Sequence, residues 1–405
     1  MDEYYSWIEE HINNDPAALR LKYSGKRMPF DVADAILQIE CRRKYAKKLR
    51  DTLAAFPRFR FPNALSGEQS TSDLLAGFHA TLSPEGATVV DLTSGLGIDA
   101  LHLAKLAAEV TAVERQSDLV EALRFNAAGL GTTNVSAVCA DCRDFIREAI
   151  AAGRIWDVAF IDPARRSADG SRVFALSECE PDVVAMMPDL AKICRRLIIK
   201  ASPMLDVSHT IGELSPTPAE IISLGTPTEC KELVAVVIFG QDQPADPDDV
   251  EIRAVTLTKE KTDEFDLTRR QEQDAPLPQA YPGVMEGDYV YEPYPAVMKI
   301  GANRLLAARF ALLSFHANTR LYYSPVLQTH FPGECFRVEK VLPYASKHIK
   351  RFRKEYPRIS VATRNFGLSA DSLRAKLGVS DGGDMRVYGV TDGRGERLLI
   401  VCAKG

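Results

Sequence analysis

Residues 88–114, TVVDLTSGLGIDALHLAKLAAEVTAVE, carry the pattern that decides the fold of this chain. An apolar strand ends in Asp91 and is followed by a turn containing Gly95 and Gly97, where the missing Cβ lets the backbone bend tightly. Apolar residues at helical spacing come next, and a second apolar strand then ends in Glu114. Strand, glycine turn, helix and acidic strand end are typical of a nucleotide-type site at the carboxyl edge of a parallel sheet.

Two classes of cofactor use this geometry. A dinucleotide site favours G-x-G-x-x-G, and residues 95–100 read Gly-Leu-Gly-Ile-Asp-Ala, so the number of glycines does not decide between them. Asp91 distinguishes the two cofactor classes better than the glycines do, because a carboxylate repels a pyrophosphate but attracts the ammonium of S-adenosylmethionine. The pattern resembles motif I of class I S-adenosylmethionine-dependent methyltransferases, with Glu114 as the acidic end of strand two. A structural βαβ turn without a ligand is the alternative.

The resemblance implies that the cofactor contacts come from the ends of successive strands. Asp141 follows an apolar strand over 134–139, where the family places an acidic residue beside the adenine amino group. The expected cofactor-binding residues are Asp91, Thr93, Gly95, Gly97, Asp99, Glu114 and Asp141.

A further buried-type strand, 156–161, runs into Asp-Pro-Ala-Arg-Arg at 162–166. Its Asp-Pro resembles motif IV of methyltransferases that modify nucleobases, although the second proline and the stacking aromatic of that motif are missing. Asp-Pro-x-Arg looks more like uracil C5 methyltransferases, which need a cysteine nucleophile on the next strand. That strand has none, and Cys179 lies in an expected loop, so we expect direct in-line transfer to nitrogen or oxygen, with Asp162 receiving the proton.

The remaining strands complete the expected methyltransferase domain over 66–240. The strand at 196–202 carries Lys200 at its exit, and strands at 219–224 and 233–239 are expected to close the sheet as an antiparallel edge pair. The candidate catalytic residues are Asp162, Pro163, Arg165 and Lys200. Arg165 and Arg166 are candidates to hold a substrate phosphate, with a solvated turn as the alternative.

The charge of the chain is unevenly distributed. Its net charge is −5, but residues 336–405 hold fifteen Lys and Arg against seven Asp and Glu. Such asymmetry favours nucleic-acid contact by the basic end. In the segment 347–358 cations alternate with Phe352 and Tyr356, as in a phosphate-binding and stacking surface, or as on the solvated face of an amphipathic helix. The candidate RNA-binding residues are Arg166, Lys347, Lys350, Arg351, Arg353, Lys354 and Arg364.

Composition narrows the class of protein. No apolar run approaches the ~18 residues of a membrane span, and the beginning of the chain lacks the features of a signal peptide. We therefore expect a cytoplasmic protein with reduced cysteines and no membrane partner. No metal is expected, because the Cys139–Cys142 pair has no second pair nearby and the histidines are scattered.

The first 65 residues are expected to be helical, with a long helical pattern over 31–50. Its basic cluster either adds to an RNA-facing surface or stays solvated. The segment Glu-Gln-Ser-Thr-Ser-Asp at 68–73 resembles the helix start that precedes motif I in several RNA methyltransferases. A simple helix cap is the alternative reading of its hydroxyls.

After residue 240 the composition changes to a polar linker and a small α+β module. A helix is expected over 303–315 and another over 368–377, with strands at 336–340, 359–364, 385–390 and 397–403. Thr-Arg-Asn-Phe at 363–366 and Gly-Gly-Asp at 382–384 resemble the THUMP-like domain behind methyltransferase domains in an uncharacterised bacterial family. The expected organisation is a helical segment 1–65, a methyltransferase domain 66–240, a linker with a ferredoxin-like module 241–335, and a basic THUMP-like domain 336–405.

The resemblance implies that structured RNA, tRNA or rRNA, is presented to the methyltransferase domain. We therefore expect an α/β, Rossmann-like S-adenosylmethionine-dependent enzyme that methylates a base nitrogen. The alternatives are a methyltransferase acting on a protein or small molecule, and an RNA-binding protein with a relic cofactor domain.

Overall fold

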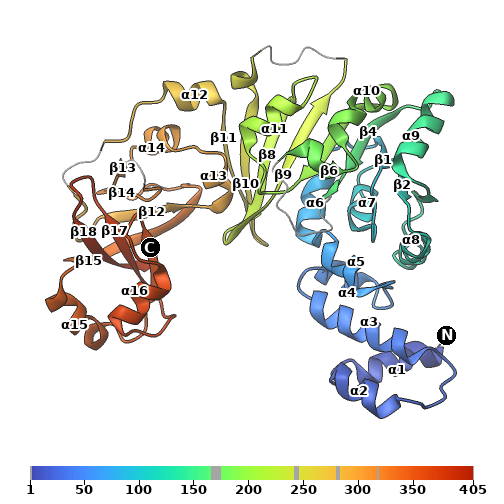
Figure 1. Cartoon of the computed structure of the whole chain (residues 1–405), viewed down its shortest axis with the longest axis horizontal. Helices are drawn as coiled ribbons and strands as arrows, with labels where there is room; N and C mark the ends of the chain where they lie inside the picture. Colours follow the sequence, from blue (N-terminus) through green and yellow to red (C-terminus); the bar gives the residue numbers. More distant parts are fainter. Residues whose placement is uncertain (1, 166–174, 241–245, 280–282, 317–318, 405) are drawn as a thin grey trace. The chain divides into compact units, whose positions relative to one another are not determined.

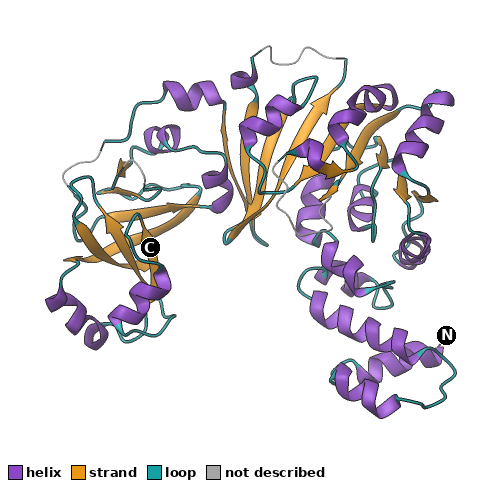
Figure 2. Ribbon diagram, in the orientation of Figure 1, coloured by secondary structure: helices purple, strands orange, loops and turns teal. Residues whose placement is uncertain are grey.

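The computed structural model describes residues 2–165, 175–240, 246–279, 283–316 and 319–404. The chain forms two compact units, of which unit 1 comprises residues 1–219 and 234–244, and unit 2 comprises residues 220–233 and 245–405. Figure 1 labels their helices and strands, and Figure 2 colours them by type.

Helices form the beginning of unit 1: α1 (Asp2–His11), α2 (Pro16–Tyr23), α3 (Val32–Tyr45), α4 (Arg50–Ala55) and α5 (Ala64–Gln69). Helix α3 begins where the Asp31 carboxylate accepts hydrogen bonds from the N–H groups of Ala33 and Asp34. Its apolar face buries Ile36 and Ile39 against α1 and α2. The helical pattern predicted over 31–50 is interrupted, because α3 ends before α4 begins at residue 50.

A parallel sheet forms the centre of unit 1, with strands in the order β3-β2-β1-β4-β7. The strands are β1 (Thr88–Asp91), β2 (Glu109–Glu114), β3 (Val135–Cys139), β4 (Trp156–Ile161), β7 (Cys194–Ala201), and the short pair β5 (Ala164–Arg165) and β6 (Cys179–Glu180). The other elements are α6 (Asp73–Thr81), α7 (Ile98–Leu103), α8 (Ser117–Gly129), α9 (Cys142–Ala151), η1 (Leu176–Glu178), α10 (Val183–Ile193) and α11 (Val207–Glu213). The strand order reverses between β1 and β4, which is where ligands bind in open α/β sheets. The predicted Rossmann-like α/β fold is confirmed.

The turn after β1 needs both of its glycines, for different reasons. Gly95 and Gly97 have φ of 53° and 85°, in the region that favours glycine. A Cβ on Gly97 would lie 2.2 Å from Cδ1 of Leu123 in α8, so this glycine allows α7 and α8 to pack. A Cβ on Gly95 would meet no described atom within 4 Å, so the space beside Gly95 stays open.

Unit 2 begins with β8 (Glu220–Thr226), and strand β9 (Glu229–Ile238) starts in unit 2 and continues in unit 1. The prediction that β8 lies in an edge pair was wrong. Strand β8 pairs in parallel with β10 (Glu251–Leu257), which pairs antiparallel with β11 (Thr262–Leu267). The physical reason is that residues 221–225 of β8 are buried on both faces, a pattern that suits an inner strand.

A seven-stranded sheet forms the rest of unit 2, in the order β13-β14-β12-β15-β18-β17-β16. Its strands are β12 (Tyr289–Pro293), β13 (Leu313–Ser314), β14 (Tyr322–Ser324), β15 (Gly333–Pro343), β16 (Ser360–Arg364), β17 (Met385–Thr391) and β18 (Arg397–Lys404). The helices are η2 (Pro247–Asp249), α12 (Arg269–Asp274), α13 (Pro295–Lys299), α14 (Arg304–Arg309), α15 (Ser346–Glu355) and α16 (Ala370–Leu377). One apolar cluster centres on Val290, Phe336 and Ile400, and another on Phe352, Leu373 and Leu399.

Two sequence expectations change in unit 2. The helix predicted over 303–315 is wrong in length, because α14 ends at Arg309 and Ala311 turns the chain with φ of 49° into strand β13. The predicted module boundary at 335/336 falls inside β15. That strand pairs with β12 on one side and β18 on the other, so the two predicted modules share one sheet.

Candidate active site

The carboxyl ends of four strands of unit 1 are tied together by backbone hydrogen bonds. The N–H of Leu92 donates to the Phe160 carbonyl at 2.9 Å, and the N–H of Ser94 donates to the Val113 carbonyl at 2.9 Å. The N–H of Ala140 completes the row by donating to the Glu114 carbonyl at 3.1 Å. The acidic residues that follow β1 to β4 therefore lie along one edge of the sheet.

Asp91 is the most buried acid of this edge, with 1% of its surface exposed. Its Oδ1 accepts the N–H of Thr93 at 3.1 Å, whereas its Oδ2 has no hydrogen-bond donor among the described residues. Burial, followed by the negative charge of Asp99, raises the pKa of Asp91 well above its usual range. A buried carboxylate oxygen without a donor is costly, and a cationic group placed against it would remove that cost.

Glu114 holds the glycine turn. Its two carboxylate oxygens accept the N–H of Gly95 at 3.0 Å and the N–H of Gln116 at 2.9 Å. These bonds fix the carboxylate at the end of β2 beside the open space at Gly95. Each oxygen keeps lone pairs for a further donor such as a hydroxyl.

Asp141 begins α9 and accepts the N–H of Arg143 at 2.9 Å. The Arg143 guanidinium also bonds this carboxylate and reaches Glu180 of β6 at 2.7 Å. The side-chain hydrogen bond from Arg143 lowers the pKa of Asp141, so the acid is ionised at neutral pH. It is one-third exposed, and thus both caps a helix and faces solvent.

Asp162 lies next to β1 and β7 at the same edge. Its N–H donates to Oγ1 of Thr93 at 2.7 Å, and its Oδ2 accepts from Nζ of Lys200 at 2.5 Å. The Lys200 side chain is 13% exposed and that of Asp162 is 36% exposed, so the carboxylate is reached from solvent while the ammonium is largely covered. The structure therefore brings together two predicted catalytic residues, Asp162 and Lys200, and the buried Pro163 follows Asp162.

Two residues beside this pair were not among the predicted site residues. Nζ of Lys200 also donates to Oγ1 of Thr71 at 3.1 Å, and Thr71 donates to Oδ2 of Asp99 at 2.5 Å. Nδ1 of His79 lies 2.7 Å from Oδ1 of Asp99. Thr71 lies in the segment 68–73, whose resemblance to the helix start before motif I competed with a simple helix cap. His79 showed only as a histidine on the apolar face of α6, which is too weak to identify a site.

Both oxygens of Asp99 are thus engaged within the protein. Burial acts to raise the pKa of Asp99, but the charge and hydrogen bond of His79, with Lys200 and Thr71, outweigh it and hold the pKa at about 2. The sequence placed Asp99 among the cofactor contacts, whereas its described partners lie in α6 and in the segment before it.

Residues Ala164 and Arg165, which follow Asp162, form the two-residue strand β5, which pairs antiparallel with β6. Arg165 in β5 lies opposite Cys179 in β6, and Cys179 is 2% exposed. Cys179 therefore belongs to a strand next to motif IV and not to the loop we expected. Arg166 lies outside the described residues.

The basic helix α15 presents five cations to solvent while Phe352 is buried against Leu373 and Ile359. The exposed cations are Lys347, Lys350, Arg351, Arg353 and Lys354, and none of them forms an ion pair within the described part of the chain. The helix is therefore amphipathic, and its charged face remains available to a polyanion.

Arg364 differs from these cations. Its guanidinium pairs with Glu292 of β12, whose other oxygen accepts from Arg386 at 2.8 Å and from Tyr388 at 2.7 Å. The side chain of Glu292 is 11% exposed, so this cluster ties β12 to β16 and β17 inside the sheet. The sequence-based assignment of Arg364 to RNA therefore competes with an ion pair inside the protein.

The basic residues near the N-terminus are mostly engaged locally. Lys48 donates to the carbonyls of Gly67 and Glu68 at the end of α5, and Lys44 pairs with the Glu68 carboxylate at 2.9 Å. Arg42 donates to the Phe59 carbonyl at 3.0 Å. These contacts give the cluster a role in holding helices together.

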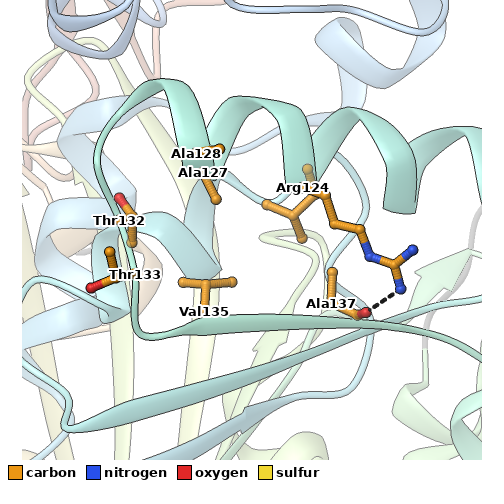
Figure 3. Close-up of a pocket in the computed structure, with 8 residues that line it drawn as sticks. Arg124, Ala127, Ala128, Thr132, Thr133, Val135 and Ala137 are labelled. Atoms are coloured by element: carbon orange, nitrogen blue, oxygen red, sulfur yellow. Dashed lines mark hydrogen bonds between the residues drawn. The ribbon is translucent and has the colours of Figure 1, made fainter.

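A shallow pocket of about 340 Å³ lies between α8 and β3 (Figure 3). Its lining is apolar apart from two threonines and Arg124, whose guanidinium donates to the Ala137 carbonyl at 2.7 Å. None of the predicted cofactor residues lines it, so this pocket is separate from the acidic edge.

Among the described residues, no group of three or more His, Cys, Asp or Glu side chains is arranged to hold a metal ion. Within the same residues, no helix has the length and apolar character needed to cross a membrane.

Comparison with known proteins gives two domain-family matches and one structural match over the full chain. Residues 289–332 match the family of ferredoxin-like domains, and residues 333–404 match the family described as THUMP domain-like. The crystal structure of a candidate methyltransferase from Porphyromonas gingivalis W83 matches with a TM-score of 0.88 at 30% identity, covering 100% of this chain and 98% of that one. The chain belongs to this methyltransferase family. The predicted combination of a methyltransferase domain with ferredoxin-like and THUMP-like modules is confirmed.

Curated relatives of the methyltransferase cover less of the chain. The 23S rRNA (uracil(747)-C(5))-methyltransferase RlmC of Shewanella amazonensis is 28% identical over 165 residues, 36% of this chain and 41% of that protein. The 23S rRNA (uracil(1939)-C(5))-methyltransferase RlmD of the same organism is 40% identical over 83 residues, 20% of this chain and 18% of that protein. The chain thus matches less than half the length of these relatives.

Proposed function

We propose that this methyltransferase transfers a methyl group from S-adenosylmethionine to a base nitrogen of structured RNA, either tRNA or rRNA. The observation that carries the proposal is the acidic edge, where a buried carboxylate lacks a donor and a solvent-reached carboxylate is paired with a lysine. The names of the curated relatives and the THUMP-like match support RNA as the substrate class.

The residues of the edge fit S-adenosylmethionine by chemistry. Asp91 would accept a hydrogen bond from the ammonium through its unpartnered Oδ2, and Glu114 would accept from the ribose hydroxyls beside Gly95. Asp141 would accept from the adenine amino group at the mouth. When bound, the cofactor supplies an electrophilic methyl on a positively charged sulfur.

Asp162 is the group proposed to act on the acceptor. As the nitrogen gains the methyl group and the carbon–sulfur bond breaks, the nitrogen must lose a proton, and the Asp162 carboxylate can accept it. Lys200 orients that carboxylate through its 2.5 Å hydrogen bond. The remaining rate enhancement would come from positioning.

Helix α15 is the proposed contact for RNA phosphates. Removing one cation that neutralises a phosphate should reduce the salt dependence of binding by a slope of about 1. Replacing Lys350 and Arg353 with serine should therefore weaken RNA binding at low salt and reduce the slope by about 2. The matched control replaces Lys259, an exposed lysine between β10 and β11, and should leave binding unchanged. An unchanged slope in the double variant would remove α15 from the RNA interface.

The test of the acceptor compares modified nucleosides in tRNA and rRNA from strains with and without the gene. We expect one N-methylated base to be lost and to return with the wild-type gene but not with Asp162→Ala. If no nucleoside changes, the acceptor is a protein or small molecule, or the domain is a relic that binds RNA.

A second candidate is methylation of uracil at C5. The paired position of Cys179 opposite Arg165, together with the names of the curated relatives, favours it. That reaction requires the cysteine thiolate to attack C6 of the base. RNA containing 5-fluorouridine should then form a denaturant-stable adduct that Cys179→Ser abolishes. Loss of 5-methyluridine in the deletion strain would establish this candidate in place of the nitrogen acceptor.

A further inference from the structure

We propose that Thr71, Asp99 and His79 are positioning residues that hold the Lys200 ammonium against Asp162. The inference rests on the proposed function, because it assigns to these residues a role in the same transfer step. None of them touches the acceptor in this account, and they act through Lys200.

The direction of each hydrogen bond follows from what each group can donate. Asp99 is ionised and can only accept, so the Thr71 hydroxyl must donate its single proton to Asp99 at 2.5 Å. The lone pairs of Thr71 are then left for Lys200, which donates to Thr71 at 3.1 Å. A threonine oriented in this way favours a charged ammonium as its donor.

His79 fixes the far end of this chain of hydrogen bonds. Its side chain is fully buried, and its Nδ1 lies 2.7 Å from the second oxygen of Asp99. With both oxygens held, the Asp99 carboxylate cannot rotate away from Thr71. The hydroxyl is therefore locked toward Asp99, and the ammonium is locked between Thr71 and Asp162.

These hydrogen bonds connect three segments that lie far apart in the sequence. Thr71 precedes α6, Asp99 lies in α7, and Lys200 lies near the end of β7. A lysine side chain has four rotatable bonds and loses its geometry readily unless it is fixed by partners. Thr71 and Asp162 restrain Nζ of Lys200. A residue that orients a catalytic carboxylate needs such a restraint.

The test removes the Thr71 hydroxyl while keeping the shape of the side chain. Thr71→Val should lower kcat about tenfold, the effect of losing one hydrogen bond to a charged group, with the KM values for cofactor and RNA within about twofold of wild type. Thr71→Ser should restore kcat, because the hydroxyl returns. The matched control is Thr81→Val on the exposed end of α6, which should behave as wild type.

A second readout does not depend on RNA methylation. Competitive acetylation of Lys200, measured by mass spectrometry on the full chain, should increase in Thr71→Val and return to the wild-type level in Thr71→Ser. Wild-type kcat and wild-type Lys200 labelling in Thr71→Val would overturn the inference. Loss of kcat in Thr71→Ser as well would also overturn it, by showing that the position is sensitive to any change. If Lys200 labelling responds as expected but no variant, including wild type, methylates RNA, then the proposed function fails and the restraint on Lys200 stands.

Discussion

Asp91→Asn should have opposite effects on two properties of the protein: it should raise the stability of the protein alone and lower its affinity for the cofactor. The substitution keeps the shape of the side chain and its hydrogen bond from the Thr93 N–H, but it removes the negative charge from a group that is 1% exposed. In the protein alone we expect this variant to be more stable than wild type, because the removed charge has no partner at Oδ2.

The size of the expected stability gain follows from Oδ2 of Asp91, which has no hydrogen-bond donor among the described residues. A buried acceptor without a hydrogen bond costs about 1–3 kcal/mol, and an amide in its place costs less than a carboxylate. We expect a gain of about 1 kcal/mol in the free energy of unfolding of unit 1, or about 2–4 °C in Tm for a unit of this size. Affinity for S-adenosylhomocysteine should fall about 10- to 150-fold, the range for loss of a charge-assisted hydrogen bond.

The stability difference between Asp91→Asn and wild type should depend on pH. Because burial raises the pKa of Asp91, the native state binds this proton more tightly than the unfolded state. The resulting stability is fully present below the unfolded pKa of about 4 and is lost as the pH rises through the native pKa. The advantage of Asp91→Asn over wild type should therefore grow from acidic to alkaline pH.

The assay combines thermal unfolding across pH with calorimetric titration of S-adenosylhomocysteine. Asp118→Asn, an isosteric change at an exposed position on α8, serves as the control and should alter neither quantity. An Asp91→Asn protein that binds the ligand with wild-type affinity, or that is less stable than wild type at every pH, would contradict the role given to Asp91.

Two further predictions concern the fold. Gly97→Ala should destabilise unit 1 by about 2 kcal/mol in urea denaturation, because the new Cβ would lie 2.2 Å from Leu123 and φ is 85°. The control Gly153→Ala has a positive φ but no described neighbour within 4 Å, and it should cost about 1 kcal/mol. Equal losses in the two variants would show that packing at Leu123 does not matter. Glu292→Gln should destabilise unit 2 by about 3 kcal/mol, since it removes the charge of a nearly buried acid that pairs with two half-buried arginines. Glu339→Gln in an exposed pair should cost less than about 1 kcal/mol. An unchanged urea midpoint for Glu292→Gln would contradict the role given to this cluster.

The methyltransferase sheet was predictable because its signals are local. Its strands are short apolar runs, and β1 and β2 end in acidic residues that the sequence displays directly, Asp91 and Glu114. The strand β11 beyond β8 was missed because its alternating sequence, with Phe265 and Leu267 buried, lies in a polar stretch. Pairing of that kind is decided by the neighbouring strand and not by the residues themselves.

The site was predictable in its acids but not in their partners. The sequence placed Asp162 and Lys200 at the ends of strands, and the parallel register brings them within 2.5 Å. His79 lies in α6 and Thr71 just before it, and no local pattern specifies how this segment packs on the sheet. The role of Arg364 likewise depends on Glu292, which lies 72 residues away in the chain.

Methyl transfer by the purified protein is the direct test of the proposed activity. Labelled S-adenosylmethionine is incubated with RNA from a strain lacking the gene, with cofactor binding measured in the same samples. We predict label in RNA with wild type and none with Asp162→Ala, although both proteins bind the cofactor. Cofactor binding without label in RNA for wild type, or equal labelling by the two proteins, would contradict this prediction.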